Sequence, residues 1–177
     1  MDAVTLLREQ LKTAHWVLEG TMADVTPEQM DWAPPGIANP LGASYAHTVT
    51  SEDMVINGML REGAPLFASA WAGKTGSNEP MPRPGPDWEK YGSWARNVQV
   101  DLPAAREYAQ AVYASSDEYL AGLTPEALDT QLDLSGIGMG QVSLASAISL
   151  LVIGHINNLA GEISCLKGIQ GAKGYPF

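Results

Sequence analysis

The sequence predicts an all-α protein, an up-down bundle of four long helices. Four stretches of the chain place apolar residues at three- and four-residue spacing, which is the period of an amphipathic helix. No stretch alternates convincingly between apolar and polar residues, as a half-buried strand would. The connections between the four stretches range from short to very long, as in helix bundles. With 177 residues and no internal repeat, the chain fits a single domain over residues 1–177.

The first two long helices are predicted over residues 2–22 and from Asn39 to Gly63. Between them, Thr26 is a cap-like residue, Pro27 takes the first helical position, and a Pro-Pro-Gly sequence stops the helix. This segment therefore predicts one short turn of helix followed by a loop. The apolar stripe of the first helix consists of Val4, Leu7, Leu11, Ala14 and Leu18.

The second half of the chain contains the other two long helices. A surface loop dense in glycine and proline, residues 73–86, is followed by a short helix near residues 87–97. The third long helix starts at Asp101, a good N-cap, with Pro103 in its first turn. The fourth covers residues 142–170. We expect the last residues to form an extended tail whose aromatic end docks on the body or on another subunit.

The charge balance argues against nucleic-acid and membrane partners. The chain has 10 basic and 20 acidic residues, a formal net charge of −10, and no basic cluster. Nucleic acid and anionic membrane surfaces repel such a chain. His155, Asn157 and Asn158 interrupt the most apolar window, which favours a buried bundle helix over a membrane span. Met1 leads directly into an amphipathic helix without a signal-peptide pattern, so we expect a cytoplasmic location.

His155 is a titratable side chain in the middle of a long apolar helix pattern. On a projection of about 100° per residue, His155 lies at the centre of the buried stripe, and Glu162 falls on the same side. A buried imidazole needs a hydrogen-bond partner, and a buried carboxylate is costly unless it is paired. Two such groups on the inner face of one helix predict a polar pocket inside the bundle.

Two further histidines occupy other helices. His47 shares a face with Ser51 and with small residues that leave space, and His15 lies at the edge of the apolar stripe of the first helix. The spacing leaves open whether the three histidines converge or are separate, hydrogen-bonded core residues. The single cysteine, Cys165, points in a direction divergent from His155, so a Cys-His nucleophile pair is not predicted.

Four motifs in the sequence belong together: the turn phrases VTPEQMDWAPPG and LTPEALD, the helix ANPLGASYAHTVTSEDMVINGML, and the C-terminal GHINNLAGEISCLKGIQG. They resemble the DinB-like (YfiT-like) metalloenzyme superfamily, and the resemblance covers nearly the whole chain. It implies an up-down-down-up four-helix bundle, usually a homodimer, with a divalent-metal site. Relatives include thiol S-transferases that use bacillithiol or mycothiol and a mycothiol-dependent isomerase.

The metal site that the resemblance implies takes one histidine from the second helix and a His-x-x-x-His pair from the fourth. His47 matches the second-helix ligand and His155 the first member of the pair, while Leu159 stands at the place of the second. Leucine does not bind metal, and a catalytic site normally holds three protein ligands. His15 is the better candidate for the third ligand, because Glu162 is about 10 Å along the helix axis from His155.

Two interpretations of function follow from the resemblance. In the first, zinc or nickel held by His47 and His155 serves a thiol S-transferase-like enzyme, and Glu162 or Glu52 orients a ligand or acts as base. In the second, the metal site is degenerate, and the protein is a structural homodimer or binds a small apolar or mixed molecule. The expected pocket residues are Ser51, Leu159 and Glu162.

Overall fold

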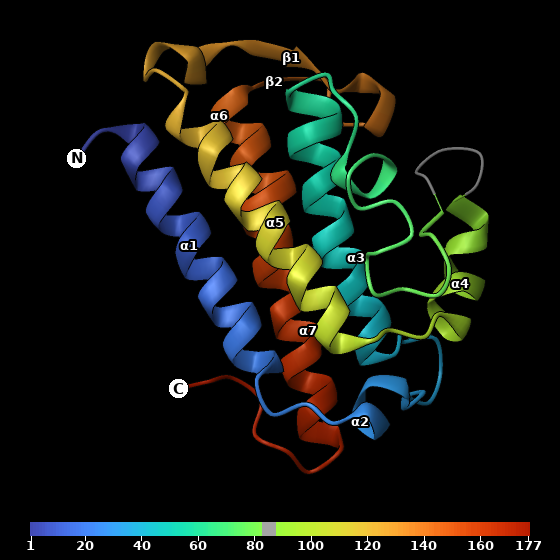
Figure 1. The fold of residues 1–177 in the computed structure, drawn as a ribbon. Helices are drawn as coiled ribbons and strands as arrows, with labels where there is room; N and C mark the ends of the chain where they lie inside the picture. Colours follow the sequence, from blue (N-terminus) through green and yellow to red (C-terminus); the bar gives the residue numbers. More distant parts are fainter. Residues whose placement is uncertain (83–87) are drawn as a thin grey trace.

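The computed structural model describes residues 1–82 and 88–177 and is predominantly helical (Figure 1). In this part of the chain, four long helical stretches lie where the sequence predicts them, which confirms the expectation of a mostly helical protein. They are α1 (Ala3–Met22); α3 (Leu41–Asp53), continued by a π-helical segment (Met54–Leu60); α5 (Leu102–Ala121); and, in succession, α6 (Leu144–Ala147), a second π-helical segment (Ile148–Gly154) and α7 (His155–Ile169).

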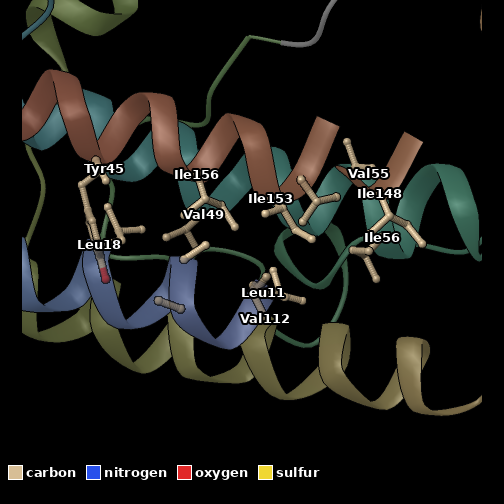
Figure 2. Close-up of a cluster of buried hydrophobic side chains, with 14 of the residues drawn as sticks. Leu11, Leu18, Tyr45, Val49, Val55, Ile56, Val112, Ile148, Ile153 and Ile156 are labelled. Carbon is tan, nitrogen blue, oxygen red and sulfur yellow. The ribbon is translucent and has the colours of Figure 1, made fainter. Parts of the chain in front are cut away.

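The long helices pack around one shared core. α1 contacts α5 and α7, and α3 contacts the same two helices. Figure 2 shows apolar side chains from these helices converging, and those at most 2% exposed include Leu11, Ile56, Val112, Ile148 and Ile156. Burying one side chain of this size contributes about 1.5–3 kcal/mol. The core therefore fixes the positions of the helices that carry the histidines.

Short helices and turns connect the long ones, and local capping sets where they begin. Thr26 caps α2 (Pro27–Asp31) and forms a reciprocal capping box with Gln29. Asp101 accepts a hydrogen bond from the backbone N–H of Ala104 at the start of α5, as predicted. Further short elements are α4 (Tyr91–Asn97) and 3₁₀ turns at Leu66–Ala68, Trp88–Lys90, Glu126–Asp129 and Ser135–Ile137.

A small β-hairpin departs from the expectation of a helical chain without a sheet. β1 (Gln131–Asp133) and β2 (Gln141–Ser143) pair antiparallel, with Leu132 opposite Val142. The expectation of no sheet is wrong at this point, because strands of 3 residues are too short to show an alternating pattern. Between them, Gly138 adopts a left-handed φ of 81°, which an L side chain rarely does.

The π-helical segment before α7 changes which residues of the C-terminal stretch face the core. Ile148, Val152, Ile156 and Ile163 are at most 1% exposed, whereas His155 is half-buried. The expectation that His155 lies at the centre of the buried stripe is therefore wrong. A π-helix closes each hydrogen bond over one more residue than an α-helix, so each residue turns through less than about 100°. A projection at the α-helical period consequently misplaces residues across this segment.

The long glycine- and proline-rich loop is held against the segment that leads into α5. Ser77 pairs with Val100 as an isolated bridge, and the backbone N–H of Asn78 donates to the carbonyl of Gln99. Residues 83–86 of the predicted loop, and residue 87 at the start of the predicted short helix, lie outside the described residues. The rest of that short helix appears as the turn at residues 88–90 and α4.

The C-terminal residues fold back onto the body, which is one of the two positions expected for the tail. Pro176 lies against Gly20 of α1, where an added Cβ would come within 2.8 Å of the proline side chain. Phe177 stacks on Trp16 of α1 and on Tyr175, with ring centroids 6.1 and 5.4 Å apart. The tail therefore ties the end of the chain to its first helix.

The stretch Leu144–Ile169 is long and apolar enough to cross a membrane when judged by length and composition. In the structure it packs against both α1 and α3. Its apolar residues at most 1% exposed, such as Ile148, Ile156 and Ile163, belong to the shared core. It is therefore a core helix of the bundle.

A buried carboxylate fixes the end of α3. Asp53 is 0% exposed and accepts hydrogen bonds from the side-chain amide of Asn57 and the hydroxyl of Tyr108 on α5, at 2.8 and 2.7 Å. It also accepts the backbone N–H groups of Leu66 and Phe67, each at 2.9 Å. Burial, and then the charge of Asp53, raise the pKa of Tyr108, so its hydroxyl stays a donor. Asp53 thereby joins α3, α5 and the loop between them.

Replacing Asp53 with alanine is expected to lower the free energy of unfolding by about 3 kcal/mol or more, because several buried donors lose their acceptor. Asp129→Ala is the matched control, since Asp129 is exposed, and it should change the same quantity by less than about 0.5 kcal/mol. Urea unfolding followed by circular dichroism measures both variants. Equal losses in the two would contradict the structural role of Asp53.

Candidate functional site

His47 of α3 and His155 of α7 face each other. Their ring centroids are 4.9 Å apart and the ring planes are inclined by 75°, which is an edge-to-face contact. The two side chains meet because α3 and α7 pack directly against each other. The structure thus brings together the two histidines that the family resemblance assigns to one site.

The loop after α3 and the start of α4 enclose His47. Its Nδ1 lies 3.2 Å from the sulfur of Met81, and its ring meets that of Tyr91 edge-on, with 5.1 Å between centroids. Burial, and then the proximity of His155, lower the pKa of His47 from 6.5 to about 4. The imidazole of His47 is therefore neutral at pH 7.

His155 is half-buried at the start of α7. Its Nε2 is buried and has no hydrogen-bond partner among the described residues. Burial lowers the pKa of His155, so this ring is also neutral at pH 7. A buried polar atom without a partner costs free energy, and such atoms are rare in native proteins. Among the described residues, the Nε2 of His155 shares this condition only with the hydroxyl of Ser116.

An apolar groove of about 420 Å³ opens beside His155, between the two π-helical segments. Leu150 and Ile137 on its rim are 58% and 49% exposed, so the groove is open to solvent. π-Helical turns are frequent at functional sites. No sequence pattern predicts the groove, because π-helical turns leave no signal in apolar spacing. Its lining consists of Ser51, Met54, Val55, Met59, Ile137, Leu150, Leu151 and His155.

His15, the candidate third ligand, has other partners. Its Nε2 lies 3.1 and 3.0 Å from the two carboxylate oxygens of Glu52, and its ring stacks on Tyr113 with centroids 3.7 Å apart. Glu52 is 1% exposed. It points about 140° round α3 from His47, because five residues at about 100° separate them. His15 is therefore engaged in a buried pair with Glu52, on another side of α3 from the contact between His47 and His155.

The predicted pocket residues lie on different sides of the site. Ser51 lines the groove together with His155. Leu159 is 8% exposed, one turn beyond His155 on α7. Glu162 is exposed. Burial, and then the charge of Glu162, raise the pKa of Tyr91 to about 12, and Tyr91 contacts His47. Glu162 is therefore close enough to Tyr91 to raise its pKa, but it does not line the groove.

A half-buried polar cluster that no sequence pattern predicts lies around Glu19. This residue of α1 accepts hydrogen bonds from the hydroxyls of Tyr45 and Tyr113, each at 2.8 Å, and lies 3.6 Å from Arg106. Figure 2 shows Tyr45 reaching from α3 toward α1. Burial raises the pKa of both tyrosines, so they remain donors. Glu19 reads in the sequence as an ordinary polar residue of an amphipathic helix, so no pattern marks it.

A second hollow, of about 490 Å³, is lined by Met81, Thr50, Phe67 and Trp94 among others. Within the described residues, none of its lining side chains has a buried polar atom that lacks a partner. The groove beside the second histidine is lined by a residue, His155, that does have such an atom. The groove is therefore the better candidate for a ligand site.

The sequence profile of the DinB superfamily matches residues 10–158, which include His47 and His155. This chain belongs to the DinB superfamily. The crystal structure of a conserved protein from Enterococcus faecalis is similar to it, with a TM-score of 0.79 and 22% identity over 97% of this chain and 99% of that chain. At this identity, the likeness establishes the fold alone. No curated protein matches the chain significantly.

The DinB superfamily is generally associated with metal, and the side chains at His155 decide whether this member fits a resident ion. His47 and His155 offer neutral imidazoles, and the unpartnered Nε2 of His155 suits a ligand bond. Leu159 occupies the position of the other expected ligand. Within residues 1–82 and 88–177, no three His, Cys, Asp or Glu side chains are grouped to hold a metal ion. The residues present therefore do not fit a three-ligand metal centre.

Acid is expected to destabilise the protein through His47. Its pKa is about 4 in the folded protein against an ordinary 6.5, so the native state binds fewer protons than the unfolded state between these values. This stabilising contribution is complete above the ordinary pKa and is lost as the pH falls through the folded pKa. The whole loss is roughly 3 kcal/mol.

An NMR titration of the His47 ring resonances measures the folded pKa directly and should give a midpoint near pH 4. The free energy of unfolding should fall less steeply with acid in His47→Gln than in the native protein, because glutamine does not titrate. A midpoint at the ordinary histidine value would contradict a buried, neutral His47.

Proposed function

We propose that this DinB-superfamily protein binds a small molecule, without a metal ion, in the space beside His47 and His155. The observation that carries the proposal is the buried, unpartnered Nε2 of His155 next to an open groove. Native proteins satisfy nearly all of their buried polar atoms, and a ligand that supplies a partner accounts for this exception. The site is a degenerate form of the expected metal site, because Leu159 stands in place of a ligand.

The chemistry of the site follows from its neutral imidazoles. A neutral imidazole has one N–H donor and one acceptor nitrogen, so His155 orients a ligand group that either donates or accepts a hydrogen bond. Ser51 adds a hydroxyl to the same wall. His47, held by Met81 and Tyr91, supports the ring of His155 edge-on. A ligand that covers the apolar lining would displace water from these groups, which strengthens each hydrogen bond to the ligand.

The second candidate is a divalent-metal-dependent, thiol S-transferase-like activity, which the family resemblance implies. Its support is that both histidines are neutral, the form in which imidazole binds metal. It requires zinc or nickel to stay bound with only His47 and His155 as protein ligands.

Metal content and ligand binding distinguish the two candidates. Elemental mass spectrometry of protein purified without a nickel column should find far less than one equivalent of zinc or nickel. Fragment screening by NMR should then find neutral or charged small molecules that shift the ring resonances of His47 and His155. One equivalent of retained metal, or the absence of any fragment that shifts these resonances, would contradict metal-independent ligand binding.

Leu159→His is expected to restore the missing metal ligand. Leu159 lies about 40° around the axis of α7 and about 6 Å along it from His155. Two histidines four residues apart on a helix have this offset, which allows both to bind one metal ion. We expect the native protein to bind zinc or nickel weakly, and the variant to bind at least about tenfold more tightly, or about 1.4 kcal/mol. Without metal, the variant should be less stable, because a buried leucine is replaced by a polar ring. Added metal should restore the stability by mass action.

Calorimetric titration and thermal melts with and without zinc measure these effects. Leu159→Gln is the matched control, because it introduces polarity without an imidazole. Adding His155→Gln to Leu159→His should remove the gain in affinity. If the native protein binds zinc as tightly as the variant, another residue completes the site and the degenerate-site proposal fails. If neither binds, the family's metal chemistry does not extend to this chain.

We also propose the finer architecture that the resemblance implies: a single domain over residues 1–177, folded as an up-down-down-up bundle, in a cytoplasmic homodimer. The helix directions in Figure 1, where α1 and α7 run one way and α3 and α5 the other, support the bundle topology. Support for the homodimer comes from Trp16 and Phe177, which stack on each other and are 57% and 72% exposed. Clustered exposed apolar side chains of this kind mark association sites.

A homodimer should have twice the 18.8 kDa mass of the chain when light scattering is measured at tens of micromolar, an ordinary working range. Replacing Trp16 and Phe177 together with serine should shift the protein toward the monomer. Ile37→Ser is the control, because Ile37 is 98% exposed on a loop and should leave the mass unchanged. A monomeric native protein would refute the proposed assembly.

A further inference from the structure

The groove beside His155 is lined without a fixed charge. Apart from Ser51 and His155, the described lining residues are methionine, valine, isoleucine and leucine. No described lysine, arginine, aspartate or glutamate side chain is among them. The polar groups are thus confined to Ser51 and the imidazole, whereas the rest of the wall offers only apolar contact. This distribution is that of a site for a molecule with one polar end.

We propose that the ligand of this site is an uncharged amphiphile. Its neutral hydroxyl, thiol or amide head bonds to His155 and Ser51, and its apolar tail lies between the π-helical segments Met54–Leu60 and Ile148–Gly154. This inference rests on the proposed function, because it names the ligand class of the same site.

The free-energy cost of desolvation excludes a ligand whose head group is charged. An unpaired carboxylate or ammonium group loses far more free energy on entering an apolar site than a hydroxyl group that gains a hydrogen bond. No described lining side chain offers an opposite charge that would offset this loss. For an anion, the net charge of −10 on the chain adds repulsion at long range. A neutral head avoids both penalties and needs only a hydrogen bond from the two polar residues of the lining, Ser51 and His155.

The apolar residues that line the rest of the groove indicate the chemical nature of the ligand's tail. Met59, Ile137 and Leu150 are 36%, 49% and 58% exposed, so a tail lying between them would remove apolar surface from water. Met54 and Met59 are unbranched and adapt to tails of different shape. The groove volume of about 420 Å³ lies in the range of small-molecule sites. These features favour a flexible aliphatic chain over a rigid polar ring.

The test compares three probes that share one tail and differ in the charge of the head: 1-octanol, octanoate and octylammonium at pH 7.5. Protein labelled with ¹³C on its methionine methyl groups reports binding, since Met54 and Met59 line the groove and Met1, Met22 and Met30 do not. We expect 1-octanol to shift the resonances of Met54 and Met59, and to bind about tenfold more tightly than 1-hexanol because two methylenes are added. The two charged probes should bind at least tenfold more weakly than 1-octanol.

Two matched variants locate the site. Leu150→Asp introduces a charge on the rim of the groove, whereas Ile169→Asp introduces the same charge at a residue of similar exposure, 61% against 58%, near the end of α7. Both positions are on the surface, so both variants should fold. Leu150→Asp should abolish binding of 1-octanol, and Ile169→Asp should leave it unchanged.

Several results would overturn the inference. Octanoate or octylammonium binding as tightly as 1-octanol would refute the selection by charge. Shifts confined to methionines outside the groove, or no shift with any probe, would refute the assigned tail site. Dissociation of a native dimer by Leu150→Asp would show that a second copy of the chain covers the groove. The proposed function is tested separately. It would stand in each case if other fragments shifted the His47 and His155 resonances of the metal-free protein.

Discussion

The carboxylate of Asp53 is the interaction on which the geometry of the site depends. It stands where α3 gives way to the π-helical segment, and it accepts hydrogen bonds from Tyr108 on α5 and from the backbone of Leu66 and Phe67. The loop that begins there leads to Met81, which covers His47. One buried acceptor thus fixes a helix end, a neighbouring helix and the loop that closes one side of the site. A fully satisfied buried polar network of this kind rigidifies its surroundings.

The chemistry of the histidine pair is set by what surrounds it. His47 and His155 lie in contact, and a contact between two protonated rings would be repulsive, so their burial and their proximity favour the same neutral state. The superfamily resemblance implies a third histidine one turn beyond His155 on α7. This chain has the apolar residue Leu159 at that position. Among the described residues, the two imidazoles therefore meet without a third side chain that could complete a metal site.

Signals close together in the sequence predicted the helices well, and contacts between distant residues explain what was missed. The capping pattern at Thr26 and Asp101 depends on residues three positions away, so the sequence shows it directly. The pairing of His47 with His155 came from the family resemblance, since no local pattern joins two helices. The pairing of His15 with Glu52 and the β-hairpin depend on tertiary packing. π-Helical turns shift the helical phase without changing the apolar spacing, which is why His155 was placed too deep in the core.

The docking of the C-terminal residues on α1 gives the two ends of the chain different mechanical strengths. A pull on Phe177 loads its stacking on Trp16 first and then the contact of Pro176 with Gly20, one contact after another. The tail therefore peels away at low force before any long helix is stressed. A pull on Met1 along the axis of α1 loads all contacts of that helix with α5 and α7 at once. Such a shear geometry resists far more force, so the protein is mechanically weak at its C-terminus and strong at its N-terminus.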